Sequence, residues 1–243
     1  MNVQAALFLL CDKKVLSQQQ INLAFIQACR RGDPHIKSFF ALTDVNPNDC
    51  IYTPLMEASI GGHADTVSSL LAAGADVNFC APCGNTALTC ASTADVVHTL
   101  LAAGATLGVD YNCTALYMAA DRHQWEVVEA IVSSAQFTDF TDKDYHLDDM
   151  LTHALETACR TPIDTLDGLN TVKGLLSIDA KPSARCLENC YHFLGRDNVP
   201  YAKDALAALV DAGCKLKYIC STKQLCLINI VSKLAVEHAT KES

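Results

Sequence analysis

One stretch, 53-TPLMEASIGGHADTVSSLLAAGADVN-78, contains the signals that decide the fold. Thr53 can cap the start of a helix, and Pro54 then takes the first helical position, where its missing N–H has no cost. A glycine pair interrupts the chain before a second pattern, of valine and leucine at helical spacing. Gly74 can supply the left-handed residue that ends this pattern. The stretch therefore predicts two short helices joined by a tight turn.

The same order of signals occurs three times. The segments 53-TPLMEAS-59, 86-TALTCAS-92 and 114-TALYMAA-120 begin alike, and each is followed by a run with paired apolar residues. Their first threonines are 33 and then 28 residues apart, because the unit that begins at Thr86 is shortened between its helices and in the finger that follows. One such unit cannot bury its apolar face alone, so neighbouring units must stack. The repeat predicts an all-α solenoid.

These units resemble the ankyrin repeat. The resemblance rests on TPLxxA from Thr53, on the Gly62-His63 pair and on LLxxGADVN from Leu70, and 24-AFIQACRRGDPHIKSFFALTDVN-46 resembles a degenerate first unit. It implies an ankyrin-repeat solenoid of about six helix-turn-helix units with terminal capping helices. In the three clear units the family's motif histidine is replaced by Met56, Thr89 and Tyr117. We therefore expect the bracing hydrogen bonds of that histidine to be lost.

Beyond residue 136 the motif fades, but the rhythm of paired helices persists. The segment 206-LAALVDAGCKLK-217 resembles the LLxxGADVN ending of the clear units. The alternative is an unrelated helical domain from about residue 138 onward. The predicted organisation is an N-terminal capping helix over 1–23, ankyrin repeats over 24–136, divergent ankyrin-like helical pairs over 137–217 and a C-terminal capping helix over 218–243.

Composition narrows the function classes. The formal net charge is -9 and no Lys/Arg cluster stands out, which argues against nucleic acid as a partner. No apolar run approaches the roughly 18 residues of a membrane span, and the short run 5-AALFLLC-11 lacks the basic residue and cleavage site of a signal sequence. The 13 cysteines are odd in number and mostly fall inside helical patterns, as free thiols do in a reducing compartment. We expect a cytoplasmic protein that binds no membrane.

Two groups of cysteines are candidates for metal binding, redox activity or catalysis. Cys80 and Cys83 form a CxxC that could hold zinc, with Cys50 as a third thiol, or could cycle between redox states; the competing interpretation is incidental finger cysteines. Cys186 and Cys190 lie near His192, but on a helix the histidine would point away from Cys190, so core packing is favoured. No phosphate-binding loop, paired-histidine motif or nucleophile elbow occurs. We therefore expect no catalytic residue, metal or cofactor.

Two further features have alternative interpretations. The acidic stretch 139-DFTDKDYHLDD-149 lacks the calcium-loop spacing and is either a solvated finger that favours the next helix start or a docking patch for a basic partner. Trp125, the single tryptophan, either packs between second helices or is an exposed hot spot.

The resemblance implies a non-enzymatic module that binds another protein in a concave groove lined by fingers and first helices, and we expect the chain to be monomeric. The alternative is a bacterial effector or regulator, acting in a host-cell cytosol, with an unrecognised enzymatic C-terminal helical domain. Carried onto this sequence by the family's usage, the partner-contacting residues are Tyr52, Glu57, Ile60, Asn85, Cys90, Tyr111, Asn112, Met118, Asp121 and Arg122.

Overall fold

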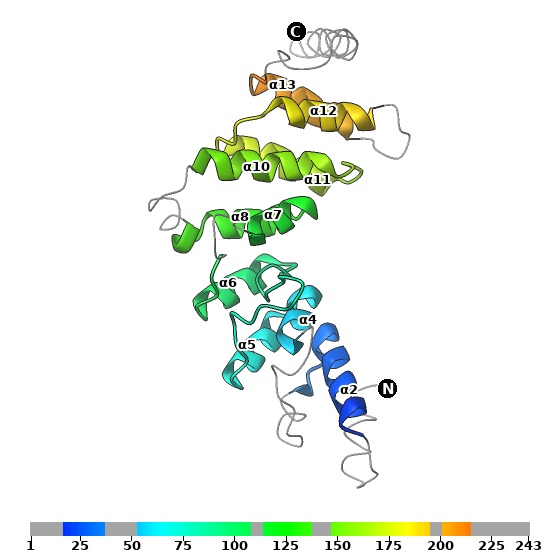
Figure 1. Ribbon diagram of the computed structural model, residues 1–243, viewed down its shortest axis with the longest axis vertical. Coiled ribbons are helices and arrows are strands. Elements are labelled where there is room, and N and C mark those ends of the chain that lie inside the picture. The colour runs from blue at the N-terminus through cyan, green and yellow to red at the C-terminus, as the bar shows by residue number, and fades with distance from the viewer. Residues whose placement is uncertain (1–16, 37–52, 108–113, 138–146, 195–200, 215–243) are drawn as a thin grey trace. The chain divides into compact units, whose positions relative to one another are not determined.

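The computed structural model describes residues 17–36, 53–107, 114–137, 147–194 and 201–214. Within these ranges every regular element is a helix and no strand occurs, which confirms the all-α prediction (Figure 1). The chain divides into two compact units, residues 1–110 with 130–136 and residues 111–129 with 137–243. The predicted terminal capping helices lie outside the described residues, apart from residues 17–23.

The first unit is built from short helices packed in chain order. Helix α2 packs against α4, α4 against α5, and α5 against α6. Alanine, valine and leucine side chains at their contacts are fully buried, Leu70 and Leu100 among them. The bounds of these helices are α2 Gln18–Arg31, α4 Pro54–Gly61, α5 Ala64–Ala72 and α6 Ala94–Ala102.

The predicted start and stop signals act as expected in this unit. The Thr53 hydroxyl accepts a hydrogen bond from the Met56 N–H at 3.3 Å, and Pro54 is the first residue of α4. Gly62 ends α4 in the left-handed conformation with φ of 75°, and Gly74 and Gly104 follow α5 and α6 with φ near 89° and 88°. Glycine adopts this conformation without the steric cost that a Cβ brings.

The segment 86–92 differs from the prediction, because it forms a single turn over 87–90 and no regular helix. The Thr89 hydroxyl accepts the Thr86 N–H at 2.8 Å and donates to the Thr86 carbonyl at 2.9 Å. Ser92 directs its N–H to the Ser59 carbonyl of α4 at 3.2 Å. Side chains that bond their own local backbone compete with helix formation. Here they hold a compact turn, which fits the shortened unit.

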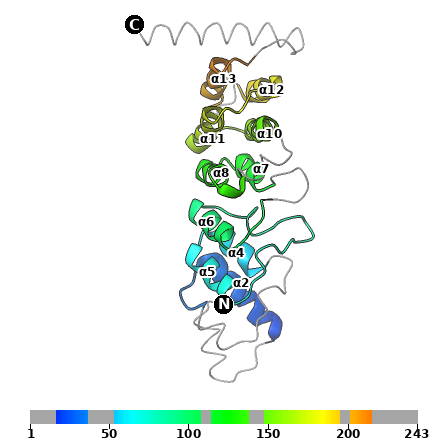
Figure 2. The same cartoon turned by 90° about the vertical axis from the view of Figure 1, so that its left-hand side faces the viewer.

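The second unit consists of two layers of helices. Helices α7, α10 and α12 form one layer, in which α10 packs against both neighbours, and α8, α11 and α13 form the other (Figure 2). Helices α10 and α11 also pack as a pair, as do α12 and α13. The bounds are α7 Thr114–Asp121, α8 Trp125–Val132, of which residues 125–129 belong to this unit, α10 Leu147–Arg160, α11 Leu166–Ser177, α12 Ala184–Phe193 and α13 Ala202–Asp211.

Second helices end in the same way in both units. The Ala75 N–H, after Gly74, bonds to the Leu70 carbonyl at 3.0 Å. In the second unit Asp179 and Gly213 take the same left-handed position, with φ of 72° and 82°. The residue after each bonds back by the same step, from Ala180 to Leu175 at 3.1 Å and from Cys214 to Leu209 at 3.2 Å. The α10–α11 and α12–α13 pairs therefore share the ending of the clear repeats.

Candidate functional site

We call the earlier helix of each pair its first helix, and its solvent-exposed side the first-helix face. In the first unit this face belongs to α2 and α4, and in the second to α7, α10 and α12. The described contact candidates fall into two groups, Glu57, Ile60, Asn85 and Cys90 in the first unit and Met118, Asp121 and Arg122 in the second. Tyr52, Tyr111 and Asn112 lie outside the described residues.

The candidates of the first unit differ in accessibility. Ile60 and Asn85 are half-buried, whereas Cys90 is only 2% exposed. Cys90 belongs to the turn over 87–90, where no helix directs its side chain to solvent. Cys90 therefore offers almost no side-chain surface to a partner.

Glu57 is also nearly buried, at 9% exposed, and it has a partner within the chain. Its Oε2 lies 3.4 Å from Nη1 of Arg30 on α2, whose side chain is 61% exposed. The carboxylate thus lies below the surface and the guanidinium lies at it. Burial, reinforced by the Glu57 carboxylate, raises the pKa of the neighbouring Cys29 thiol far above its usual range, so this thiol stays protonated.

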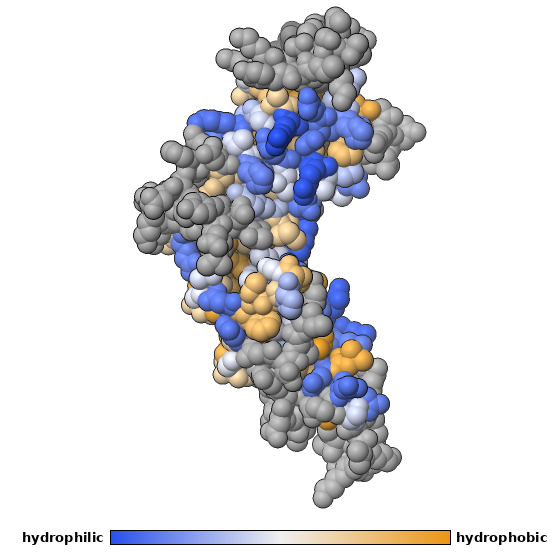
Figure 3. All heavy atoms as spheres, in the orientation of Figure 1, coloured by the Kyte–Doolittle hydropathy of each residue, from blue (hydrophilic) through white to orange (hydrophobic). Residues whose placement is uncertain are grey.

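Helix α2 supplies the exposed apolar residue of this face. Leu23 is 57% exposed, and it lies four and seven residues before Gln27 and Arg30, on the same side of the helix. Figure 3 shows apolar surface over α2. Leu23 and Arg30 were not among the contact residues predicted from the sequence. The pattern could have revealed Leu23, since the apolar stripe Ala24, Phe25 and Ala28 points into the core without it.

In the second unit, ion pairs join successive first helices. Arg160 of α10 lies 2.8 Å from Oδ1 of Asp121 on α7, and Arg185 of α12 lies 3.9 Å from Oε2 of Glu156 on α10. The arginine side chains are 69% and 81% exposed, while the two carboxylates are 33% and 19% exposed. As in the first unit, the carboxylate is the less exposed partner of each pair and the arginine is the more exposed one.

Other polar groups complete this face. Tyr117 of α7 packs edge-on against His153 of α10, with ring centroids 4.6 Å apart. Met118 is half-buried and Arg122 is exposed. Strongly hydrophilic residues gather over α10 and α12 in Figure 3. The sequence could not pair Asp121 with Arg160, because the two residues are 39 positions apart and share no motif.

The other candidates give no second site. Cys80 and Cys83 are exposed and form no disulfide, and within the described ranges no group of three or more His, Cys, Asp or Glu side chains is arranged to hold a metal. Cys50 lies outside those ranges. Cys186 and Cys190 are fully buried, whereas the nearby His192 is exposed and packs against Phe193, so no Cys–His pair forms.

The structure bears on the alternative interpretations of Trp125 and of the acidic stretch 139–149. A Cβ on Gly174 of α11 would lie 2.4 Å from the Trp125 ring, so the ring packs between second helices as one interpretation expected. Asp148 and Asp149 belong to the backbone of α10, near its first residue. Residues 139–146 lie outside the described chain.

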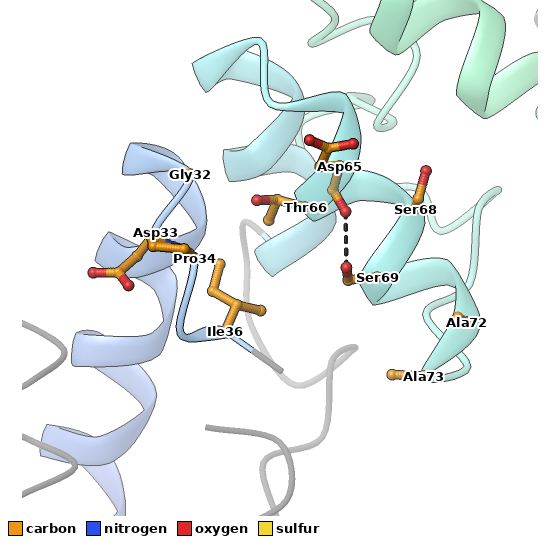
Figure 4. Close-up of a pocket in the computed structure, with 10 residues that line it drawn as sticks. All are labelled: Gly32, Asp33, Pro34, Ile36, Asp65, Thr66, Ser68, Ser69, Ala72 and Ala73. Carbon is orange, nitrogen blue, oxygen red and sulfur yellow. Dashed lines mark hydrogen bonds between the residues drawn. The ribbon is translucent and has the colours of Figure 1, made fainter. Parts of the chain in front are cut away.

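The first unit also has an open hollow of about 740 Å³ between α5 and the turn after α2 (Figure 4). Ile36 and Thr66 project toward it, and Ser69 on its wall bonds to the Asp65 carbonyl at 2.8 Å. None of the predicted contact residues lines it. Separately, the helices that the structure describes include none with the length and apolar character needed to cross a membrane.

Known proteins with similar chains agree on the fold. The human ASB11 ankyrin repeat domain matches with 23% identity over 82% of this chain and 87% of its own, at a TM-score of 0.59. An ankyrin repeat domain from Acinetobacter baumannii AYE matches with 21% identity over 79% and 98%, at 0.53.

A third structure contains a partner. A chain in the structure of the Bdellovibrio bacteriovorus predatory endopeptidase Bd0816 in complex with immunity protein Bd3460 matches with 23% identity over 77% of this chain and 97% of its own, at a TM-score of 0.52. No curated protein matches the sequence. A family model described as ankyrin repeats in three copies matches residues 25–111 and 62–144. Residues 25–144 of the chain therefore belong to the ankyrin-repeat family.

Proposed function

We propose that this chain is a non-enzymatic module that binds a partner protein through its first-helix faces. Ankyrin repeats are protein-interaction modules, and the observation that carries the proposal is the surface of α2. There the 57%-exposed Leu23 lies on the same side as Arg30, whose guanidinium is held by Glu57. An exposed leucine beside an oriented arginine is the combination from which interface contacts are commonly built.

The ion pairs support this proposal by fixing the arginines before binding. A guanidinium has five N–H donors, and a single carboxylate partner leaves some of them free to bind another molecule. Arg160 and Arg185 have such partners in Asp121 and Glu156, and both remain more than two-thirds exposed. A partner would therefore meet arginines that have already lost part of their side-chain freedom, which lowers the entropy cost of binding.

The remaining contact candidates keep their proposed role where the surface allows it. Ile60, Asn85, Met118, Asp121 and Arg122 have at least part of their side chains accessible. Glu57 acts through Arg30. Tyr52, Tyr111 and Asn112 remain proposals.

Two finer statements belong to the same proposal. The similar chain from the complex of an endopeptidase with its immunity protein suggests a protein partner for this chain too. The ankyrin-repeat fold is typically non-enzymatic, and we propose a monomeric cytoplasmic protein that binds neither membrane nor nucleic acid. The alternative is a bacterial effector or regulator with an enzymatic C-terminal helical domain; a buried Cys–His pair would favour it, but the exposed His192 lies apart from the buried Cys186 and Cys190.

Position-specific photo-crosslinking tests the proposal. A photoreactive amino acid replaces Leu23 on the first-helix face or, as the matched control, the exposed His98 of α6, a second helix. We expect a defined partner protein to crosslink from position 23 only. With that partner purified, Leu23→Ala should weaken binding by about 2 kcal/mol, roughly 30-fold, if Leu23 is a hot spot. Equal crosslinking at both positions, or unchanged affinity for L23A, R30A and R160A together, would place the binding surface elsewhere.

A further inference from the structure

We propose that Cys80 and Cys83 form a site of reversible modification, at which a small-molecule disulfide such as oxidised glutathione closes a disulfide ring between them. Both cysteines lie between α5 and the turn over 87–90. Among the described cysteines these two are exposed, whereas the others are buried or half-buried. A dissolved oxidant can therefore reach this pair while the protein stays folded.

The backbone of this segment brings the two cysteines together. The Gly84 N–H donates to the Ala81 carbonyl at 2.8 Å, which closes a turn over residues 81–84, and the Ala81 N–H donates to the Asn85 carbonyl at 2.8 Å. In an extended chain, Cα atoms three residues apart would be separated by roughly 10 Å, whereas a disulfide requires about 4.4 to 6.8 Å. The turn supplies the shortening that a ring needs.

One oxygen atom connects Cys80 to the peptide group that follows Cys83. The Cys80 thiol donates to the Ala81 carbonyl at 3.6 Å, and the same oxygen accepts the Gly84 N–H. This N–H belongs to the peptide bond between Cys83 and Gly84. The Cys80 sulfur therefore lies at the hydrogen bond that closes the turn containing Cys83.

The residue types of the turn hold its shape before any ring forms. Pro82 occupies the first central position, where its fixed φ suits a turn, and Gly84 takes the last position with φ of 83°. Because this backbone is already folded back, closing a ring costs little further chain entropy.

The chemistry is two successive thiol–disulfide exchanges. One thiolate of the pair attacks a sulfur of oxidised glutathione, the S–S bond breaks, and one glutathione leaves as a thiolate. The second thiolate of the pair then attacks the protein sulfur of the mixed disulfide, and the other glutathione leaves. The two departing thiolates take up the two protons that the cysteines released. In total, two cysteine thiols and one oxidised glutathione give one disulfide and two reduced glutathiones.

The ring would restrain the segment that presents Asn85, one of the contact candidates, since Asn85 is hydrogen-bonded to Ala81 within it. This consequence rests on the proposed function, whereas formation of the ring does not. In a reducing compartment such a ring would be transient, as redox-sensing disulfides of intracellular proteins usually are.

Peptide mapping tests the ring. The folded full chain is equilibrated with oxidised and reduced glutathione, quenched with acid and alkylated under denaturing conditions. Cleavage before aspartate residues then gives one peptide, residues 76–94, which contains Cys80, Cys83 and, as an internal control, the buried Cys90. By mass spectrometry we expect this peptide to have lost two hydrogens and to carry a single alkyl group, on Cys90. Dithiothreitol should restore alkylation of all its thiols.

Two single variants separate ring closure from simple thiol reactivity. In Cys80→Ser and in Cys83→Ser the remaining thiol should stop at the glutathione adduct. In the parent chain the ring should exceed the adduct about tenfold at roughly 0.1 mM reduced glutathione, because closely linked groups have an effective concentration on the order of 1 mM. Circular dichroism should be the same for all three chains, since both positions are exposed.

The proposal is overturned if Cys80 and Cys83 are both alkylated at every glutathione ratio, if the parent chain accumulates the adduct as the variants do, or if Cys90 is linked to either cysteine. The mapping uses no partner protein, so its failure is distinguishable from a failure of the proposed partner binding.

Discussion

The two units differ in the side-chain contacts that hold neighbouring helices together. In the first unit the His63 ring lies against Gly32 and Gly61, and its Nε2–H donates to the Arg30 carbonyl of α2 at 3.1 Å. In the second unit His123, in the left-handed conformation with φ of 57°, places its Nε2 2.9 Å from the Thr161 hydroxyl. Both units contain a histidine at the turn between two helices, yet the two rings reach different partners.

The same contrast holds for the glycines that allow close approach. A Cβ on Gly61 would lie 2.3 Å from the Arg30 carbonyl oxygen, whereas a Cβ on Gly174 would lie 2.4 Å from the Trp125 ring. The first unit packs glycine on backbone and on the His63 ring, while the second packs glycine on the Trp125 ring. The difference teaches that one stacking geometry can be maintained after its motif residues have been replaced, provided that the shape of the contact is kept.

The largest effect is expected from Gly61→Ala. The new methyl group meets backbone that cannot rotate away, so we expect a loss of about 3 kcal/mol in the free energy of unfolding of the first unit. Urea denaturation followed by circular dichroism measures it. Gly104→Ala is the control: its Cβ meets nothing within 4 Å, and only the left-handed backbone costs about 1 kcal/mol. Equal losses would show that the contact with Arg30 is unimportant.

Gly174→Ala should have a smaller effect on the second unit, about 2 kcal/mol, because the Trp125 ring can shift where a carbonyl cannot. A double-mutant cycle with Trp125→Leu sharpens the comparison. If ring and glycine are in contact, the double variant loses less than the sum of the two single losses. Additive losses would refute the proposed packing of α8 on α11.

His123 should make the stability of the second unit depend on pH, with a still smaller effect than the glycine substitutions. Burial lowers the pKa of His123 against the opposing effects of the Pro162 carbonyl, Asp164 and Asp121. The unfolded chain therefore binds the proton more tightly, so this contribution to stability is complete above the unfolded pKa of about 6.5 and is lost as pH falls through the lower folded value.

A melting series from pH 8 to pH 5 measures this loss in the second unit. His123→Asn keeps a residue that tolerates the left-handed conformation and should remove part of the decline. His98→Asn, at an exposed position of α6, should leave the decline unchanged. An identical pH profile for the parent chain and H123N would contradict the role of His123.

The smallest effects concern the arginines. Arg160→Ala breaks an ion pair in which both partners are at least one-third exposed, so we expect a loss of at most about 0.5 kcal/mol. Arg30→Ala leaves the nearly buried Glu57 without its cation and should cost more, about 1 kcal/mol. Thermal melts of the two variants compare the losses, and the reverse order would count against the buried position of Glu57.

The sequence was most informative where local chemistry decides the structure. The Thr53 cap, Pro54 and the left-handed Gly62, Gly74 and Gly104 are confirmed because each depends on only a few neighbouring residues. The expected helix over 86–92 was wrong, since the bonds that replace it include a tertiary one, from Ser92 to Ser59.

The motif histidine illustrates the same limit. Its bracing was expected to be lost at all three positions, but the Thr89 hydroxyl makes two hydrogen bonds to Thr86 and retains local bracing there. At the candidate site the sequence located the first-helix faces and missed their ion pairs. Asp121 with Arg160 and Glu156 with Arg185 join residues on different helices, and only the fold brings them together.

The turn over 87–90 has a consequence for how the first unit opens. Its backbone makes one bond from Cys90 to the Thr86 carbonyl and one from Ala91 to the Leu88 carbonyl, where a full helix would make a longer ladder. Amides in so short a ladder exchange their hydrogens through small openings that leave the surrounding helices folded. Deuterium would therefore enter the first unit early at an interior position, beside the well-formed helices α5 and α6.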